Sequence, residues 1–337
     1  AVADEADLNV ADATGAEDTA IPLTISSELT DVDGSETLSL TISGVPEGAT
    51  LSAGTYDEET GDWTLTPDQL EGLTVTPATN DSDNFQLTVT ATTTDGTDTT
   101  SVSETLDVTV EGVADAPTLD VTDAAGTEDQ PIALDIQSGL TDDSEVLSVT
   151  ISGVPEGATL SAGTFDEQTG DWALSPADLV GLTVTPPADS DEDFELTVTA
   201  TSTETDPDTG EQGTATTTGT MQVSVDPDAD APTLNVSDAS GAEDTAIPLT
   251  ISSELTDTDG SETLSLTISG VPEGATLSAG TYDEETGDWT LTPDQLEGLT
   301  VTPAADSDED FQLTVTATTT DGTDTATVSE TLDVMVQ

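Results

Sequence analysis

Apolar and polar residues alternate along many short stretches of this chain. Strict alternation occurs at residues 38–42 (LSLTI), 106–110 (LDVTV) and 194–200 (FELTVTA). Successive side chains of a β-strand point to opposite faces, so this alternation is typical of strands with one buried face and one solvated face. No stretch of useful length shows the 3.6-residue apolar period of an amphipathic helix. The pattern therefore predicts an almost all-β protein.

The alternating stretches belong to three copies of one module. The string ISGVPEGATLSAGT stands at residues 42–55, 151–164 and 268–281, and GDW follows each copy. Turn signals recur inside each copy at the spacing of a sandwich of short strands. We expect repeats at 1–112, 113–227 and 228–337. Each repeat would be a β-sandwich, and short connectors containing proline would join the three into an elongated array.

Local signals predict a capped turn and a set of buried rings. Thr66-Pro67-Asp68-Gln69 predicts a short helix, with Thr66 as N-cap, Pro67 at the first helical position and Gln69 closing a capping box. We assign the aromatic residues to the core or its edge, and an exposed tryptophan that stacks on a sugar stays the alternative. These residues are Tyr56, Trp63, Phe85, Phe165, Trp172, Phe194, Tyr282, Trp289 and Phe311.

The composition adds a large negative charge. The chain has 72 acidic residues and no Lys, Arg or His, so its formal net charge at pH 7 is −72. Nucleic acid and anionic lipid would repel such a chain, and we exclude both as partners. No apolar run is long enough to insert into a membrane, and there is no cysteine. The chain starts without an initiator Met and stops inside a strand pattern, so we expect a segment of a longer protein.

Three acidic motifs recur at fixed places in the copies. The first is ED before a strand, the second is DxDGSE or the shorter DDSE, and the third is DSDED or the looser NDSDN. The first motif comprises Glu17, Asp18, Glu128, Asp129, Glu243 and Asp244. The second comprises Asp31, Asp33, Glu36, Asp142, Asp143, Glu145, Asp257, Asp259 and Glu262. The third comprises Asp81, Asp83, Asp189, Asp191, Asp193, Asp306, Asp308 and Asp310.

No basic side chain can neutralise these acids. In an extended chain Asp189, Asp191 and Asp193 would project from one side, about 6.6 Å apart. Two such charges repel by roughly 2.5 kcal/mol at an effective dielectric constant near 20. Calcium fits best, because it accepts about six to eight oxygen ligands, whereas magnesium needs tighter geometry and transition metals favour His or Cys. A merely solvated acidic surface is the alternative, and the recurrence of the clusters favours calcium.

The order of these motifs resembles the cadherin-like, Ig-like tandem repeats of giant bacterial RTX-type adhesins, which type I systems secrete. The resemblance runs from EDT and LTDxDGSE through SGVPEGATLSAGT, GDW and DSDED to VADAPTL, and it covers essentially the whole chain. It implies Greek-key sandwiches stiffened by calcium at the junctions between repeats. It adds Asp115 and Asp230 of the two ADAP segments to the ligands, and Asp4 and Asp7 at the start of the first repeat. The DDSE of the middle copy departs from the pattern because it lacks the VDG residues.

Together these features predict a structural extender, or stalk, of a bacterial cell-surface adhesin that bound Ca²⁺ rigidifies. The expected partners are the neighbouring repeats of the same chain, and the expected location is extracellular, on the bacterial surface. Two alternatives stay open: a segment of an extracellular filament or biofilm matrix fibre, with other copies as partners, and a ligand-binding region of an adhesin. We do not expect an enzyme, because no His, Lys or Arg could position a substrate beside the carboxylates.

Overall fold

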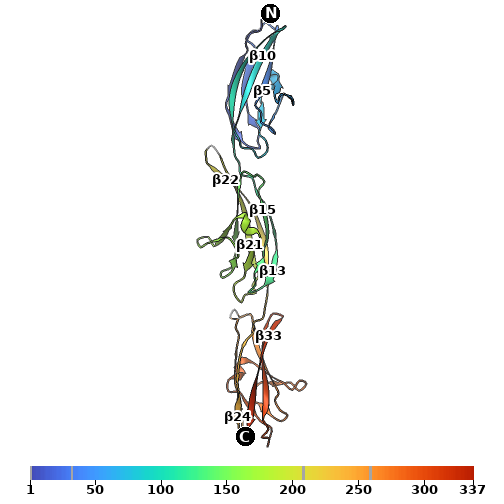
Figure 1. Ribbon diagram of the computed structural model, residues 1–337, viewed down its shortest axis with the longest axis vertical. Helices are drawn as coiled ribbons and strands as arrows, with labels where there is room; N and C mark the ends of the chain where they lie inside the picture. Colours follow the sequence, from blue (N-terminus) through green and yellow to red (C-terminus); the bar gives the residue numbers. More distant parts are fainter. Residues whose placement is uncertain (1, 32, 207–208, 258–259) are drawn as a thin grey trace. The chain divides into compact units, whose positions relative to one another are not determined.

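The computed structural model describes residues 2–31, 33–206, 209–257 and 260–337. These residues form β-strands and three short 3₁₀ helices, and they contain no α-helix (Figure 1). The prediction of an all-β protein is confirmed. Among the described residues, no helix has the length and apolar character that crossing a membrane would need.

The described residues of the first repeat form eleven strands and one 3₁₀ helix. They are β1 (Asp7–Ala11), β2 (Ala13–Ala16), β3 (Ile21–Pro22), β4 (Thr24–Glu28), β5 (Glu36–Ser43), β6 (Thr50–Leu51), β7 (Thr55–Tyr56), β8 (Trp63–Leu65), η1 (Pro67–Leu70), β9 (Thr74–Thr76), β10 (Phe85–Asp95) and β11 (Asp98–Glu111). A six-stranded sheet has the order β2-β11-β10-β5-β8-β7, and smaller sheets pair β1 with β4 and join β3, β9 and β6. The pairing of β2 with β11 is parallel, whereas β10 pairs antiparallel with both β5 and β11.

The second and third repeats have the same strand order in their sheets. The elements of the second are β12 (Thr118–Thr122), β13 (Ala124–Thr127), β14 (Ile132–Ala133), β15 (Asp135–Gly139), β16 (Val146–Ser152), β17 (Thr159–Leu160), β18 (Thr164–Asp166), β19 (Asp171–Leu174), η2 (Pro176–Leu179), β20 (Thr183–Thr185), β21 (Phe194–Thr205) and β22 (Gln212–Asp226). Those of the third are β23 (Thr233–Ser237), β24 (Ala239–Gly241), β25 (Ile247–Pro248), β26 (Thr250–Glu254), β27 (Thr263–Ser269), β28 (Thr276–Leu277), β29 (Thr281–Tyr282), β30 (Trp289–Leu291), η3 (Pro293–Leu296), β31 (Thr300–Thr302), β32 (Phe311–Asp321) and β33 (Asp324–Val336).

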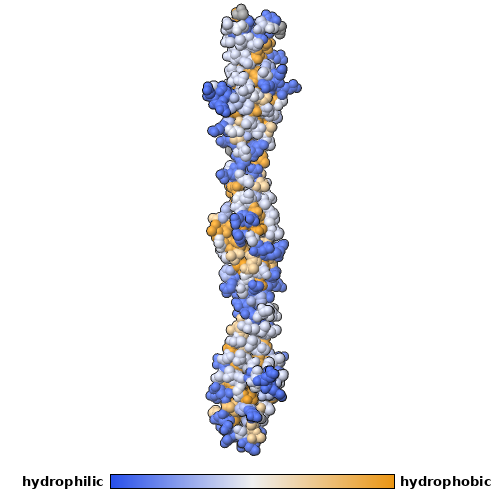
Figure 2. All heavy atoms as spheres, turned by 90° about the vertical axis from the view of Figure 1, so that its right-hand side faces the viewer, coloured by the Kyte–Doolittle hydropathy of each residue, from blue (hydrophilic) through white to orange (hydrophobic). Residues whose placement is uncertain are grey.

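The core of each repeat lies between its sheets. In the first repeat, Leu40 and Ile42 of β5 and Leu87 and Val89 of β10 are fully buried, and residues of the smaller sheets join them in one cluster. The threonines and serines between these positions face outward, as the alternation predicts. Each repeat is therefore a β-sandwich. The face shown in Figure 2 is largely hydrophilic, with smaller apolar patches between the polar residues.

Several local predictions can be compared directly with the structure. The capped turn is confirmed as η1, where the backbone N–H of Thr66 donates to Gln69 Oε1 at 2.8 Å. Trp63 and Phe85 pack at the core edge, as expected. Tyr56 is 50% exposed instead, because it lies on β7 at the edge of the six-stranded sheet. Its ring centroid is 5.4 Å from that of Trp63.

Glycine is required where the chain leaves the central strand β5. Gly44 has φ of 85°, and a Cβ at this position would lie 2.5 Å from the carbonyl oxygen of Gln86. No other residue fits such a close approach in the left-handed region. The close approach explains why the repeated string has a glycine directly after β5.

The chain divides into two compact units. The first comprises Ala1–Leu119, Gln137–Val149 and Thr199–Thr218, and the second comprises Asp120–Ile136, Thr150–Val198 and Gly219–Gln337. Each connector between sandwiches, together with the acidic loops that contact it, lies inside one unit. The repeat boundaries after residues 112 and 227 stay predictions.

Candidate metal centres at the repeat junctions

The first junction is the connector of residues 112–117, between β11 and β12, with the carboxylates around it. Glu17, in the loop after β2, is 3% exposed, and its Oε1 accepts a hydrogen bond from the N–H of Val113 at 2.8 Å. Glu145, just before β16, is 5% exposed, and its Oε1 accepts the N–H of Asp115 at 2.5 Å. The connector backbone thus binds one acid from each flanking sandwich.

Two further buried acids complete the first junction. Asp142 is 3% exposed and accepts the N–H of Ser144 at 2.8 Å, and Glu204 at the end of β21 is 4% exposed. The Ser144 hydroxyl lies 3.1 Å from Glu204 Oε2. However, Glu17 Oε2, Asp142 Oδ2 and Glu145 Oε2 are buried without a hydrogen-bond partner. A buried carboxylate oxygen without a donor is costly, so these oxygens are suited to a cation.

The second junction, residues 227–232 between β22 and β23 with its surrounding carboxylates, repeats this arrangement. Glu128 is 2% exposed, and its Oε1 accepts the N–H of Asp228 at 2.8 Å. Glu262 is 6% exposed, and its Oε1 accepts the N–H of Asp230 at 2.5 Å. Glu128 Oε2, Glu262 Oε2 and Asp321 Oδ2 are buried without a partner. Both junctions therefore present carboxylate oxygens that no protein donor satisfies.

A group of three aspartates at the second junction has the spacing of a metal site. One carboxylate oxygen from each of Asp129, Asp189 and Asp230 lies within 4.8 Å of the other two. The backbone N–H of Asp189 donates to Asp129 Oδ1 at 3.1 Å, which holds the two loops together. Two charges at this distance repel by about 3.5 kcal/mol at an effective dielectric constant near 20. A divalent cation between them would convert this repulsion into attraction.

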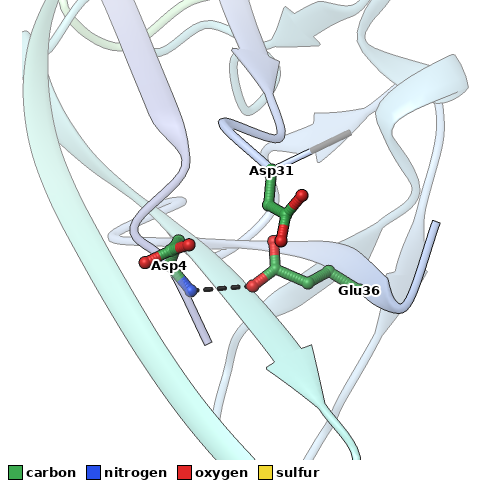
Figure 3. A group of neighbouring side chains, drawn as sticks. All are labelled: Asp4, Asp31 and Glu36. Carbon is green, nitrogen blue, oxygen red and sulfur yellow. Dashed lines mark hydrogen bonds between the residues drawn. The ribbon is translucent and has the colours of Figure 1, made fainter. Parts of the chain in front are cut away.

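A similar group lies at the start of the first repeat. Carboxylate oxygens of Asp4, Asp31 and Glu36 lie within 4.8 Å of one another. Figure 3 shows the carboxylates of Asp31 and Glu36 facing each other, while the N–H of Asp4 donates to Glu36 Oε1 at 2.7 Å. Glu36 is 7% exposed, and its Oε2 has no partner. The same contact, in which a glutamate Oε1 accepts the N–H of an aspartate, joins Glu145 to Asp115 at the first junction and Glu262 to Asp230 at the second.

Burial makes these acids hard to ionise in the absence of a cation. Burial raises the pKa of Glu17, and the charges of Asp142 and Glu204 raise it further. Burial raises the pKa of Glu128 to about 7, and the adjacent Asp321 contributes in the same direction. Two facing carboxylates have no proton donor between them unless one is protonated. A bound cation would remove the need for that proton.

The same causes act on the other junction acids. Burial, followed by the charge of Asp142, raises the pKa of Glu145, and burial with Asp257 raises that of Glu262. Burial and the charges of Asp129 and Asp189 raise the pKa of Asp230. Every resolved shift within the junctions is upward, which is the expected sign for crowded carboxylates without counter-charges.

The predicted ligands fall into two sets. The structure brings twelve into the three acidic groups: Glu17, Asp115, Asp142 and Glu145; Glu128, Asp129, Asp189, Asp230, Asp257 and Glu262; and Asp31 and Glu36. Outside these groups, Glu243, Asp244, Asp306 and Asp308 are exposed, and Asp193 and Asp310 each accept a strand N–H, from Val225 and Val336. Three more aspartates accept a backbone N–H from a nearby loop residue: Asp33 from Ser35, Asp81 from Asp83, and Asp18 from Asn80. Asp191 is half-buried. Asp259 lies outside the described residues.

The expectation of an extended chain through the DSDED motif is wrong at its first residue. Asp189 has φ of 56°, in the left-handed region, and it forms a turn. The turn separates Asp189 from Asp193, so Asp189 joins Asp129 and Asp230 while Asp193 bonds the backbone of β22. An aspartate tolerates this conformation because its short side chain can bond locally.

Sequence reasoning missed Glu204 and Asp321. Glu204 is the second-last residue of the threonine-rich strand β21, and Asp321 is the last residue of β32. Both also stand at an inward position of the alternation, since Ser202 and Thr319 two residues earlier are fully buried. An acid at an inward strand position was the available signal.

Each repeat also has a surface cavity beside its aromatic pair. In the first repeat the cavity has a volume of about 650 Å³, and its lining includes Pro46, Glu47, Tyr56 and Trp63. The equivalent cavities in the other repeats contain Phe165 with Trp172 and Tyr282 with Trp289. These are the places where the sugar-stacking alternative would apply.

No family model matches the chain, and no curated protein matches it in sequence. Among solved structures, it is similar to Drosophila N-cadherin EC1-4 at 15% identity, with a TM-score of 0.30 over 98% of this chain and 76% of that one. It is similar to mouse protocadherin-24 EC1-3 at 16% identity, with a TM-score of 0.33 over 86% and 90%. An endo-fucoidan hydrolase from glycoside hydrolase family 107 matches at 16% identity and a TM-score of 0.25, over 88% of this chain and 39% of that one. At these scores the similarity does not say what the chain binds or does.

Proposed function

We propose that this chain is a structural extender of an extracellular protein, in which Ca²⁺ bound at the junctions holds successive sandwiches in a fixed orientation. The observation that carries the proposal is the set of buried carboxylate oxygens without partners beside each connector. In the same groups, connector N–H groups bind the other oxygen of Glu17, Glu128, Glu145 and Glu262. A cation there would link both flanking sandwiches and the connector.

Calcium is the cation that these donors fit best. The described acidic groups offer carboxylate oxygens, and the chain has no His or Cys. Such oxygen-only sites suit a hard cation, and the loops that carry them suit the flexible coordination of calcium better than the strict octahedron of magnesium. Glu17, Asp142, Glu145 and Asp115 would hold the ion at the first junction, and Glu128, Asp230, Asp257 and Glu262 would do so at the second.

An extracellular setting supports this chemistry. Extracellular calcium modules operate at dissociation constants of roughly 0.1–1 mM, so they bind calcium outside cells and stay empty where it is scarce. The acidic chain would expand by self-repulsion without calcium, and its buried acids would couple folding to calcium binding. With the resemblance to RTX-type adhesin repeats, these points support a stalk segment of a bacterial cell-surface adhesin. Nothing in this role requires catalysis.

Small-angle X-ray scattering tests the extender role. We expect the full chain in about 1 mM calcium to give a narrow distance distribution, and the chelated chain to give a broad one that indicates bending at the junctions. Magnesium at the same concentration serves as the control. Identical distributions in calcium and in chelator would rule out calcium as the rigidifying agent.

A ligand-binding region is the second candidate function, favoured by the aromatic cavity of each repeat. Tyr56 is 50% exposed beside Trp63, and Glu47 adds a hydrogen-bond acceptor to the same cavity. Pyranose rings stack on such aromatic faces, and the acidic surface excludes anionic glycans. Titration with neutral oligosaccharides should change the tryptophan fluorescence, and an unchanged spectrum would remove this candidate.

A further inference from the structure

Two segments of the module form the aromatic cavity of each repeat. One is the VPEGAT loop after β5, β16 or β27, and the other is the edge hairpin that contains the aromatic pair. In chain order the three cavities have volumes of about 650, 650 and 680 Å³. Cavities of this size accommodate small ligands or single side chains of a partner.

The edge hairpin holds one aromatic ring open to solvent in each cavity. Tyr56 and Tyr282 are 50% exposed, and Phe165 is 48% exposed. Each of these rings lies 5.4 or 5.5 Å from a tryptophan ring and is tilted against it by 45° to 47°. In the first repeat, the N–H of Asp57 donates to the carbonyl oxygen of Asp62 at 2.9 Å and closes the hairpin. The ring is therefore presented in a fixed orientation before any ligand binds.

The same cavity carries negative charge. Glu47 belongs to its lining, and the hairpin turn at residues 57–62 has the sequence DEETGD, which contains four acids. The third repeat has the same sequence at residues 283–288. An exposed aromatic face among carboxylates attracts a cation and disfavours an anion. Because the chain has no basic side chain, the complementary positive charge has to come from a partner.

Arginine is the cationic side chain that matches this combination of groups. Its planar guanidinium stacks on aromatic faces and donates two parallel hydrogen bonds to a carboxylate. It is also hydrated more weakly than the ammonium group of lysine, so it leaves water for a cavity at lower cost. An aromatic ring and a glutamate in the lining of one cavity therefore favour arginine over lysine.

We propose that the aromatic cavities bind arginine side chains of a basic partner protein. The exposed ring stacks on the guanidinium, and the carboxylate of Glu47, Glu156 or Glu273 accepts its N–H groups. Three cavities on one chain let a partner with several arginines bind more tightly than one cavity alone would allow. Calcium at the junctions is not required for this contact, and a neutral sugar is the competing ligand.

Tryptophan fluorescence tests the binding directly, because the chain has three tryptophans and each lines one cavity. The full chain in about 1 mM calcium is titrated with a peptide of alternating arginine and glycine, with the lysine peptide of equal charge, and with a neutral oligosaccharide. The arginine peptide should give a saturable change, with an affinity at least about 3-fold higher than that of the lysine peptide.

Removing the rings separates stacking from attraction by net charge. Tyr56→Ala combined with Tyr282→Ala leaves the charge of the chain unchanged and should weaken arginine binding by about 2–5-fold. Tyr56→Phe combined with Tyr282→Phe keeps a ring, as Phe165 does in the second repeat, and should bind nearly as the wild type does. Circular dichroism checks that each variant keeps the native fold.

A pair of glutamate substitutions tests the carboxylate. Glu47→Gln combined with Glu273→Gln should weaken arginine binding by about 2–5-fold. Glu71→Gln combined with Glu297→Gln is the matched control, because it makes the same charge change at exposed positions outside the cavity lining. This control should leave the affinity unchanged.

Equal affinities for the arginine and lysine peptides, or unchanged binding by the Tyr→Ala pair, would overturn the proposal, because net charge alone would then explain the binding. A fluorescence change with the oligosaccharide and none with the arginine peptide would also overturn it and leave the sugar-binding candidate. Neither result bears on the calcium role, which thermal unfolding with and without calcium tests separately.

Discussion

Glu17, Glu128 and Glu243 occupy the same position in the three repeats, yet only the first two are buried. The backbone N–H groups of Glu17 and Glu128 donate to the carbonyl oxygen of the last residue of β11 and of β22, both at 3.0 Å, and that of Glu243 donates to the residue directly after β33 at 3.1 Å. Glu17 is 3% and Glu128 is 2% exposed, whereas Glu243 is exposed. Connector N–H groups bind the first two side chains. The connector therefore buries these two glutamates, and the repeat alone does not. The free-energy cost of burying them belongs to the junction.

Glu128→Gln should stabilise the metal-free chain and weaken its response to calcium. The amide removes the charge that Glu128 places against Asp321 and supplies a donor to it, so we expect a gain on the order of 1 kcal/mol in chelator. The same amide is a poorer calcium ligand, so the rise in melting temperature on adding calcium should shrink. Thermal unfolding by circular dichroism measures both. Glu243→Gln is the control, and an equal effect of the two variants would contradict the role of burial.

The hydroxyl groups of two equivalent buried threonines, Thr93 and Thr319, allow a second comparison. Thr319 donates its hydroxyl to the carbonyl oxygen of Asp230, whereas the equivalent hydroxyl of Thr93 is buried without a partner. Thr319→Val should therefore lower the free energy of unfolding by about 1 kcal/mol, and Thr93→Val should leave it unchanged or raise it. Denaturant unfolding of the two variants tests this. A larger loss for Thr93→Val than for Thr319→Val would mean that the hydroxyls are not used as described.

At the scale of elements, the strands and turns were predictable because local chemistry determines them. Alternation of Leu and Val with Thr fixes which face of β10 is buried, and Thr66, Pro67 and Gln69 fix the start of η1. The acids at the junctions could be listed from their motifs. Their grouping could not, because Asp129, Asp189 and Asp230 are far apart in sequence and meet only when two loops and a connector come together.

Two details required the structure for specific physical reasons. The left-handed turn at Asp189 breaks the extended geometry that the DSDED spacing suggests. Tyr56 stands in the same motif as the half-buried Trp63, yet β7 has only one neighbouring strand, so the ring is half exposed. Glu204 and Asp321 could have been found from strand alternation alone, because they continue the inward-facing series of β21 and β32.

The first connector depends on a residue without a side chain. A Cβ on Gly112 would lie 2.8 Å from Cγ and Oε1 of Glu204, which is buried in the junction. Gly112→Ala should displace this carboxylate, destabilise the first junction by about 1–3 kcal/mol and weaken calcium binding there. Calcium titration and thermal unfolding measure the two effects. Gly213→Ala is the control, because its Cβ would meet the nearest atoms at 3.7 Å, and similar losses in both variants would contradict this assignment.

At the scale of the whole molecule, the net charge of −72 has no internal counter-charge. In the folded chain, burial raises the pKa of Glu128 from 4.5 to about 7, and burial also raises those of Glu17, Glu145 and Glu262. A raised carboxyl pKa means that the folded state binds protons more tightly than the unfolded state. The resulting stabilisation is complete below about pH 4.5 and is lost as the pH rises through about 7.

The metal-free chain should therefore become more stable on mild acidification. We expect its melting temperature in chelator to rise between pH 8 and pH 5, while the further gain from calcium shrinks because protons compete for the same oxygens. Thermal unfolding at a series of pH values measures both trends. In the Glu128→Gln variant, the melting temperature of the chelated chain should rise less between pH 8 and pH 5. A chelated chain that loses stability over this range would show that the acids are not crowded as the structure indicates.

The central claim is that the junction carboxylates are specific calcium sites rather than a screened acidic surface. The most direct measurement is thermal unfolding by circular dichroism of the chelated chain, then with about 1 mM calcium, and with magnesium or sodium chloride at matched ionic strength. With dissociation constants of roughly 0.1–1 mM, each site adds about 0.4–1.4 kcal/mol at this concentration. Several sites should therefore raise the midpoint by roughly ten degrees in calcium alone. An equal rise in sodium chloride would contradict the claim, because screening would then explain the stability of the fold.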